Sequence, residues 1–514
     1  MSKNIRIGYS GFISFGSRIL SLFTGLIFIT LVTRNLTQYD FGLWQLILSI
    51  VSYAVLPNVV VDYWILRDIA RGQREATTAL LFSLIIASGG LAMYILISTF
   101  SAPRVGGQFL FFVVAMAQVP LSYLSITLQT VSQAARPQSV GVAFMVFESV
   151  KVAVAALSFF VFGINLNVAI TAVLLALVAQ CIVLLAMQPR YLYKRSFSRE
   201  AVSRWLKMSW LPAFATFAGY IGTVDSLLVT AITASTLVLA NYRAANVIAA
   251  MVSHASAFAV ALYPKLIGGA ATEVSRYVMT LTMMFTIPMS AGIFVLSIPL
   301  LSILGPSYGS AYMVLWIGIP ITAIGSAHQI FEAVLMGHEK VDVSQKSSFR
   351  DYSKSRLITV PSITLFGSII SLAALAVVTY WLNSLHASPV TMAVAWSAIV
   401  ICISSPGLII KWRMMKRSKT TFSIPWKNIA IYGGASAVMV AALVATGATN
   451  IRHSSTIDLV LKLTAYLALG SAVYFGILFA LDSTFRLLVF KSIDMAKAVI
   501  APRGRTPASD SSAA

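Results

Sequence analysis

Apolar runs of about twenty residues recur along almost all of the 514-residue chain, and they restrict its fold more than any other feature. A helix needs a run of about that length to cross the hydrocarbon core of a bilayer. Because the backbone finds no water there, only helices and closed barrels span membranes. The runs lack the two-residue alternation of barrel strands, and only 10% of the residues are charged, against roughly 25% in soluble domains. The sequence therefore predicts an all-α, polytopic membrane protein.

We predict fourteen transmembrane helices from these runs. The expected spans are 8–33, 41–61, 77–99, 109–131, 141–162, 168–187, 209–231, 237–262, 277–300, 311–335, 357–381, 389–410, 428–447 and 459–481. The first follows directly on MSKNIRIGYSG. It is too long for a signal-peptide core and has no small-residue cleavage site, so we expect it to be retained as a span.

The distribution of Lys and Arg predicts the orientation, since positive residues concentrate in cytoplasmic connections. With the N-terminus inside, 30 of the 37 Lys and Arg residues fall in cytoplasmic segments and 4 in external ones. A missed span would move every later connection to the other side and destroy this asymmetry. We therefore expect a multi-pass protein of the cytoplasmic membrane with both termini in the cytoplasm.

The formal net charge of +21 also follows from these connections. A soluble chain this basic would suggest nucleic acid, but here the bases form short clusters beside the membrane, so we expect no nucleic-acid partner. The segments YLYKRSFSREAVSRWLK and KWRMMKRSKTTFSIPWK interleave bases with Trp and Tyr, which is typical of surfaces that face anionic lipids. Residues 482–500 are expected to form an amphipathic interfacial helix, and residues 501–514 a disordered tail.

Motifs for metal, cofactor or nucleotide chemistry are not found in the sequence. Cys181 and Cys402 both lie in apolar runs, and the five histidines have no ligand spacing. A GxxxxGK[ST] phosphate-binding loop is also missing. We expect no enzyme active site, no metal and no cofactor.

Six charged residues remain inside the expected spans once Lys462, at the outer end of the last span, is counted with the external connections. They are Arg18, Glu148, Lys151, Asp225 and Arg243, which lie deep, and Glu332, which lies nearer the inner end of its span. A charge at the bilayer centre costs on the order of 2.5–3.5 kcal/mol on insertion scales, and such residues usually face a partner or a water-filled cavity.

Spacing brings four of these charges together in pairs. Asp225 and Arg243 each lie nine residues from residue 234, in the bend between two spans, or about 13 Å down their helices, so they can meet across the hairpin. Glu148 and Lys151 are three residues apart on one helix face. These pairs are either structural or functional, and the sequence leaves both interpretations open.

The deep set nevertheless has more bases than acids, and Arg18 has no acidic neighbour in its own hairpin. A cavity with surplus bases suits an anionic substrate, because guanidinium forms paired hydrogen bonds to phosphate. Our candidates for binding a substrate phosphate are Arg18, Arg243 and Lys151. Our candidates for ion coupling (to protons or sodium) or gating are Asp225, Glu148 and Glu332.

Several segments resemble, in order, a known family of transporters. They include LVTRNLTQYDFGLWQLILSIVSYAV, DYWILRDIARG, TVDSLLVTAITASTLVLANYRAANVI and LGPSYGSAYMVLWIGIP. Together they resemble Wzx-type polysaccharide and oligosaccharide-lipid flippases of the multidrug/oligosaccharidyl-lipid/polysaccharide (MOP) exporter superfamily.

The resemblance implies a fold and an activity. It implies two six-helix lobes, 1–190 and 208–410, around a central cavity, with two further helices in 428–481. It also implies alternating access that moves a glycan linked to polyprenyl or dolichyl (pyro)phosphate across the membrane.

Two other functional classes stay open. A multidrug or cation antiporter of the related MATE type would favour an acidic cavity and about twelve spans. A membrane-embedded glycan ligase or polymerase would carry a long external loop, whereas the expected external connections are short.

Overall fold

The computed structural model describes residues 7–161, 163–188, 192, 197–256, 272–337, 355–417, 424–451 and 455–490, and within helix α1 it describes side chains only from Leu20 onward. The first half of the chain forms α1 (Ile7–Asn35), α2 (Gln38–Val55), η1 (Leu56–Asn58), α3 (Val59–Ala70), α4 (Ala76–Arg104), α5 (Phe109–Met116), α6 (Gln118–Ala135), α7 (Pro137–Val161), α8 (Leu166–Met187) and α9 (Arg199–Met208). The second half forms α10 (Trp210–Tyr220), η3 (Ile221–Val224), α11 (Asp225–Thr233), α12 (Leu237–Ala249), η4 (Ala250–Ser256), α15 (Thr272–Val295), α16 (Ser297–Leu304), η5 (Pro306–Ala311), α17 (Tyr312–Gly337), α19 (Arg356–Ser384), α20 (Pro389–Arg417), α21 (Trp426–Ala445) and α22 (Thr456–Leu481).

The all-α, polytopic membrane architecture predicted from the sequence is confirmed. Twelve stretches of the described chain are long and apolar enough to cross a bilayer, and each coincides with one predicted span. The two other predicted spans correspond to α1, which has 29 residues, and to α12 with η4. The end of the predicted span 237–262 lies outside the described residues, as do residues 491–514 of the expected interfacial helix and tail; residues 483–490 are helical.

Side-chain caps explain where several helices begin. Thr37, Asn165, Ser198 and Ser455 each precede a helix and accept a hydrogen bond from a backbone N–H three residues later. Such caps satisfy amide groups that have no partner in the first helical turn.

Two spans are broken at a short 3-10 turn. Pro57 lies in η1, between α2 and α3, and η3 separates α10 from α11. A proline lacks the N–H that would continue the helix, and such breaks line cavities or binding sites in membrane transporters. The breaks place polar residues within the bundle, Asn58 at the first and Asp225 at the second.

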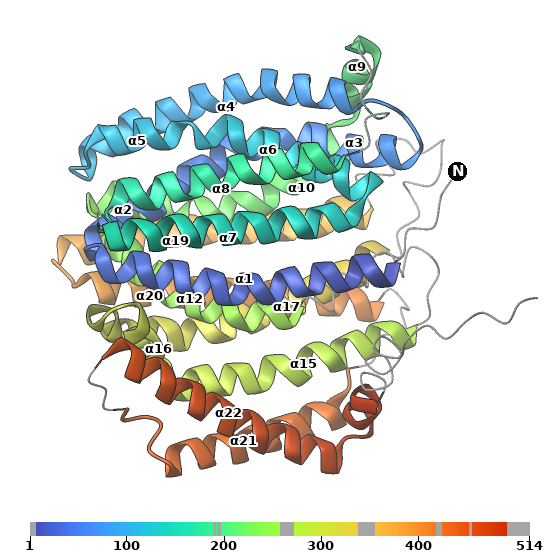
Figure 1. Cartoon of the computed structure of the whole chain (residues 1–514). Helices are drawn as coiled ribbons and strands as arrows, with labels where there is room; N and C mark the ends of the chain where they lie inside the picture. The colour runs from blue at the N-terminus through green and yellow to red at the C-terminus, as the bar shows by residue number, and fades with distance from the viewer. Residues whose placement is uncertain are drawn as a thin grey trace, which may run out of the picture.

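The helices pack in two groups that follow the chain order (Figure 1). Helices α1–α8, here called the N-terminal half, contact mainly one another, for example α1 with α7 and α6 with α8. Helices α10–α20, the C-terminal half, do the same, with α17 and α19 both packed on α20. The last pair, α21 and α22, packs on α15 and α16 at the lower edge of the view in Figure 1.

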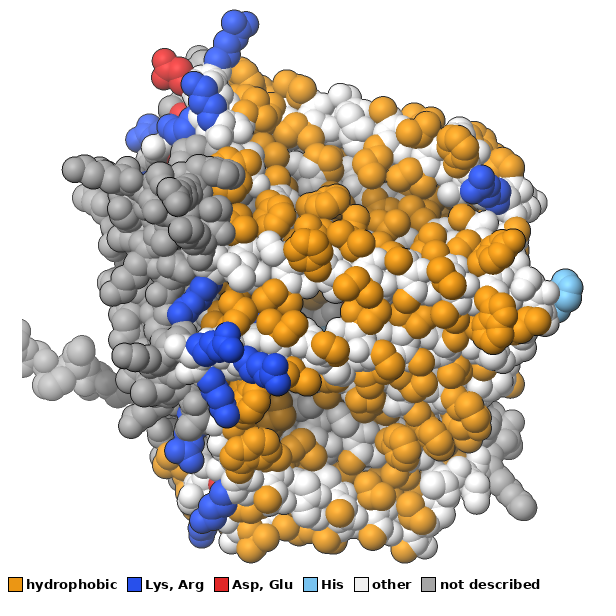
Figure 2. Space-filling view, turned by 180° about the vertical axis from the view of Figure 1, so that it is seen from behind, with side chains coloured by type: hydrophobic (Ala, Val, Ile, Leu, Met, Phe, Trp, Pro, Cys, Tyr) orange, Lys and Arg blue, Asp and Glu red, His pale blue; other side chains and the backbone are white. Residues whose placement is uncertain are grey.

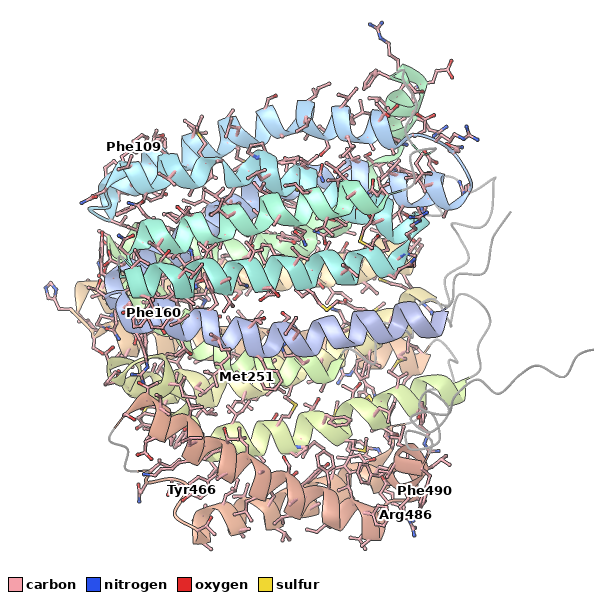
Figure 3. The ribbon with its side chains drawn as sticks, in the orientation of Figure 1. Phe109, Phe160, Met251, Tyr466, Arg486 and Phe490 are labelled. Atoms are coloured by element: carbon pink, nitrogen blue, oxygen red, sulfur yellow. The ribbon has the colours of Figure 1, made fainter. Side chains whose placement is uncertain are left out.

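The outer surface of the bundle is apolar. Figure 2 shows hydrophobic side chains over most of one face, while the Lys and Arg side chains in view gather mainly at the rim that carries the N-terminus. Phe109 and Phe160, labelled in Figure 3, are 51% and 82% exposed and lie toward the opposite end. Exposed aromatic and aliphatic groups on this scale are stable only in contact with lipid.

The two halves touch closely at the end opposite the N-terminus. Arg34 of α1 donates hydrogen bonds to the carbonyls of Ser302 and Ile303, at 2.8 and 2.7 Å. The Thr236 hydroxyl donates to the Tyr39 carbonyl at 2.8 Å, and a Cβ added to Gly42 would lie 2.2 Å from the Thr236 carbonyl oxygen. Only glycine permits this approach of α2 to the start of α12.

Candidate functional site

A cavity of about 390 Å³ lies within the C-terminal half. Its walls come from α10, η3, α11, α12, α17, α19 and α20, and its charged or titratable lining residues are Asp225, Tyr242, His328, Glu332 and Lys411. Glycine and serine supply much of the remaining wall, including Gly219, Gly222, Gly325, Gly367, Ser368, Ser371, Ser404 and Gly407. Small residues leave the space open and offer polar atoms to its contents.

Lys411 organises one end of this cavity. Its ammonium lies 2.6 Å from Glu332 Oε1, 3.1 Å from His328 Nδ1 and 3.1 Å from Thr364 Oγ1. These three acceptors match the three N–H bonds of an ammonium group. His328 Nε2 lies 3.2 Å from the Ser404 carbonyl, so the contacts suit a neutral ring that accepts at Nδ1 and donates at Nε2. The side chain of Lys411 is 2% exposed and that of Glu332 is 35% exposed.

Asp225 lies at the other end, at the start of α11. Its Oδ1 accepts hydrogen bonds from the Ser226 amide at 2.6 Å and the Ser226 hydroxyl at 3.1 Å. Its Oδ2 accepts from the Trp396 indole N–H at 3.2 Å, and that indole stacks on Tyr242 with 3.8 Å between ring centroids. Trp396 and Lys411 are fifteen residues apart on α20, so the two ends of the cavity are separated by about 22 Å.

Arg243 lies behind Asp225, where the two halves meet. Its Nη2 donates to the Ser226 hydroxyl at 2.6 Å and lies 3.5 Å from the hydroxyl of Ser49 on α2. The bend between α11 and α12 falls at Ala234, whose φ is +49°. This is the position that the sequence analysis predicted for the bend. Ser226 therefore connects the two charges, and Asp225 and Arg243 form no direct ion pair in the described structure. The Nε of Arg243 is buried without a hydrogen-bond partner.

Glu148 and Lys151 form the predicted local pair, at 2.9 Å, between α7 and α1. The Thr24 hydroxyl donates to Glu148 at 2.9 Å, and the ammonium of Lys151 lies 5.1 Å from the centroid of the Phe28 ring. Neither residue lines the cavity of the C-terminal half. Their roles in phosphate binding and ion coupling stay predictions.

Arg18 lies on the helical backbone of α1, but its side chain lies outside the described part of the structure. Its role as a phosphate ligand therefore also stays a prediction.

Several charged residues within the bundle were not among the sequence candidates, and two of them, Lys411 and Asp62, lie at the ends of predicted spans. Lys411 was counted in the connection 411–427, but α20 continues to Arg417 and buries it. Asp62 lies just beyond the predicted span 41–61, but α3 carries the helix on to Ala70. When Lys411 and Asp62 are added to the sequence candidates whose side chains are described, bases no longer outnumber acids.

A sequence signal existed for each of these residues. Glu332 was expected near the inner end of its span and needed a partner at that depth, and Lys411 lies near the same end of α20. Asp62 is four residues after Asn58 and so shares its helix face.

A second, apolar cavity of about 440 Å³ opens between α1, η4, α15, α21 and α22. We call it the apolar groove. Its lining includes Phe23, Leu26, Met251, Phe285, Met439, Leu443, Tyr466, Gly470 and Tyr474. Met251 and Tyr466, which Figure 3 labels, come from η4 and α22. The groove therefore joins the N-terminal half, the C-terminal half and the last helix pair.

Groups of three or more His, Cys, Asp or Glu side chains that could hold a metal ion are absent from the described residues.

Comparison with known proteins supports the fold. Neither a protein-family model nor a curated protein sequence matches the chain. Among solved structures, the lipid II flippase MurJ in an inward closed conformation has a TM-score of 0.60 and 13% identity, covering 96% of this chain and 99% of that one.

Two multidrug transporter structures are also similar. An inward-facing MATE family transporter of the MOP superfamily has a TM-score of 0.56 and 13% identity, covering 79% of this chain and 96% of that one. A MATE transporter in a straight conformation has a TM-score of 0.53 and 15% identity, covering 81% and 96%. The chain therefore has the fold shared by MurJ and these MATE structures, as the resemblance noted in the sequence implied.

Proposed function

We propose that this protein is a flippase that moves a lipid-linked oligosaccharide or polysaccharide precursor across the cytoplasmic membrane, with both termini in the cytoplasm. In this proposal residues 1–190 and 208–410 form two lobes that alternate between inward and outward openings. The tight contact of Gly42 with Thr236 would then be the closed outer gate of an inward-facing state.

The observation that carries the proposal is the position of the apolar groove relative to Arg243. Met251 lines the groove and follows Arg243 by eight residues on the continuous segment α12–η4, so their backbones lie about 12 Å apart. A hydrocarbon chain fits the apolar groove, and a phosphate fits a guanidinium whose Nε has no partner. A polyprenyl or dolichyl (pyro)phosphate carries both chemistries in one molecule.

We also propose separate sites for the glycan part of the substrate and for a coupling ion. The glycan would occupy the space between the lobes, beside Ser49 and Ser226. Asp225 and Glu332 are our candidates for coupling to a proton or sodium ion, because both line the cavity and each is connected to a base. Glu332 bonds directly to Lys411, and Asp225 is connected to Arg243 through the hydroxyl of Ser226.

A MATE-type cation antiporter is the second candidate, and the two carboxylates in the cavity of the C-terminal half favour it. The flippase is preferred for two reasons. The MurJ match covers 96% of the chain, whereas the two MATE matches cover about 80%, and the base Lys411 neutralises Glu332 inside the cavity. None of the structural neighbours named above is a glycan ligase or polymerase.

Reconstitution tests the proposal directly. Purified protein in liposomes is expected to expose a fluorescent lipid-linked sugar to a membrane-impermeant quencher, while liposomes without protein are not. Arg243→Ala should abolish this exchange and Arg243→Lys should retain part of it. Export of cationic dyes with no movement of the lipid-linked sugar would refute the flippase proposal and support the antiporter.

A cellular assay tests Arg18. Arg18→Ala is expected to abolish complementation of a glycan-export defect while the protein level in the membrane stays normal. If export persists at the wild-type rate, Arg18 does not bind the phosphate.

A further inference from the structure

Asp62 is a membrane-embedded acid that the proposed flippase mechanism does not use. It lies on α3, the second half of the span that breaks at Pro57, and about 12 Å from the end of that helix at Ala70. It belongs to the N-terminal half and does not line the cavity that contains Asp225 and Glu332.

A closed polar network surrounds its carboxyl group. The amide nitrogen of Asn58 lies 3.2 and 3.0 Å from the two carboxyl oxygens and 3.1 Å from the Thr127 hydroxyl. Ser83 donates to the amide oxygen of Asn58 at 2.7 Å and accepts from Thr127 at 3.0 Å. Thr127 and Thr130, both on α6, lie beside the carboxyl group.

Basic side chains do not reach this carboxyl group from any described element packed against it. Neither α6 nor α10 contains an acidic or basic residue, and the single charge of α4, Arg104, lies at the far end of that helix. On α3 itself, Arg67 stacks on Tyr63 at 4.1 Å. On α9, Arg204 is bound to Asp68 at 2.6 Å. Among the described residues, the phenol of Tyr123 is a titratable group that interacts electrostatically with Asp62.

An ionised carboxylate at this depth, without a cation, is strongly unfavourable, and buried acids of this kind commonly relay protons in transporters. We propose that Asp62 is a proton-binding site of the N-terminal half, separate from the cavity that holds Asp225. The carboxyl oxygen nearer Asn58 accepts from its amide at 3.0 Å, and the other oxygen carries the proton. The ligand is a proton rather than a metal ion, because the amide nitrogen of Asn58, a donor, lies against the carboxyl group, and Asp62 belongs to no group of three or more His, Cys, Asp or Glu side chains among the described residues.

Infrared spectroscopy of the full-length protein in lipid tests this site without any transport assay. Difference spectra between acidic and alkaline buffer should contain the C=O stretch of a protonated carboxyl group. The component of the band that belongs to Asp62 is expected to disappear in Asp62→Asn, which keeps the shape of the side chain, and to persist in the control variant Asp458→Asn, at an exposed ion pair. Persistence of the whole band in Asp62→Asn would overturn the proposal, as would loss of the wild-type band on adding sodium at constant pH.

If Asp62→Asn does not fold, a second pair of variants still tests the site. Thr127→Val removes one hydroxyl partner and should shift the pH midpoint of the band, whereas Thr99→Val, on the exposed side of α4, should leave it unchanged. Equal midpoints in wild type and Thr127→Val would count against the site. Because these readouts involve no lipid substrate, they succeed or fail independently of the flippase proposal.

Discussion

At the scale of single residues, the buried pair of Glu332 and Lys411 shows how charge is tolerated inside the bundle. Lys411 is almost fully buried, whereas Glu332 still borders the cavity. The three acceptors around the ammonium together offset its loss of hydration. Removing one member of this ion pair is therefore expected to destabilise the fold more than removing both members.

Glu332→Gln should destabilise the folded protein by about 3–5 kcal/mol, because it leaves the charge of Lys411 buried and uncompensated. The double variant Glu332→Gln with Lys411→Met should regain most of that loss. Chemical denaturation in detergent micelles measures both free energies of unfolding.

The exposed pair of Lys462 and Asp458, at 2.9 Å, supplies the control, since separating a surface pair costs at most about 1 kcal/mol. If Glu332→Gln is as mild as Asp458→Asn, the buried network does not stabilise the fold.

The sequence predicted some of these residues and not others for a physical reason. Asp225, Arg243, Glu148 and Lys151 stand in the middle of apolar runs, so their cost in a bilayer marked them at once. Lys411 and Asp62 lie where the apolar run has ended but the helix continues, so hydropathy assigned them to connections or span ends. The bridge through Ser226 depends on side-chain orientation, which spacing along the chain does not determine.

At the scale of helices, the closest contact between the two halves is the crossing of α2 and the start of α12. Gly42 touches the backbone of Thr236, while Tyr53 farther along α2 donates to the carbonyl of Thr223. Helix α2 therefore contacts the other half at two levels. In the proposed mechanism, the position of α2 decides which side of the protein is open.

Gly42→Ala should shift the protein toward an outward-open state, since the new Cβ would lie 2.2 Å from the Thr236 carbonyl oxygen. Spin labels at Asn35 and Ser307, both exposed at this end, measure the opening as a longer distance. Gly89→Ala on α4 is the control, because nothing lies within 4 Å of its added Cβ. An unchanged distance in Gly42→Ala would mean that this contact is not a gate.

The positions of the spans could be predicted from the sequence, because each span needs an apolar run. The crossing of α2 with the start of α12 could not be predicted in this way. Its closeness depends on two residues 194 positions apart in sequence, Gly42 and Thr236. The glycine alone gave no indication of what it would face.

At the scale of the whole molecule, the last helix pair completes the apolar groove. Helices α21 and α22 pack against α15 and α16, which leaves a lipid-sized space bordered by α1. The sequence predicted two extra spans at the C-terminus but could not predict where they dock, since their faces are apolar all round. Docking depends on shape, such as the contact of Gly470 with Met439 and Leu443.

Gly470→Leu should fill the groove and slow the movement of long-chain lipid-linked sugars while leaving short-chain analogues little affected. Gly476→Leu on the same helix is the matched control, because its added Cβ meets nothing within 4 Å. The liposome assay with both chain lengths measures the effect. Equal slowing of both substrates would show that the groove does not hold the lipid chain.

The central claim, that Arg243 binds the phosphate of a lipid-linked glycan, is tested most directly by equilibrium binding of a polyprenyl pyrophosphate to the purified protein. We expect Arg243→Ala to weaken binding about 10- to 100-fold, as loss of hydrogen bonds to a charged group of about 1.5–3 kcal/mol implies, and Arg243→Lys to lie between it and wild type. Equal affinity in all three proteins, or equal affinity of wild type for the uncharged polyprenol, would contradict the account.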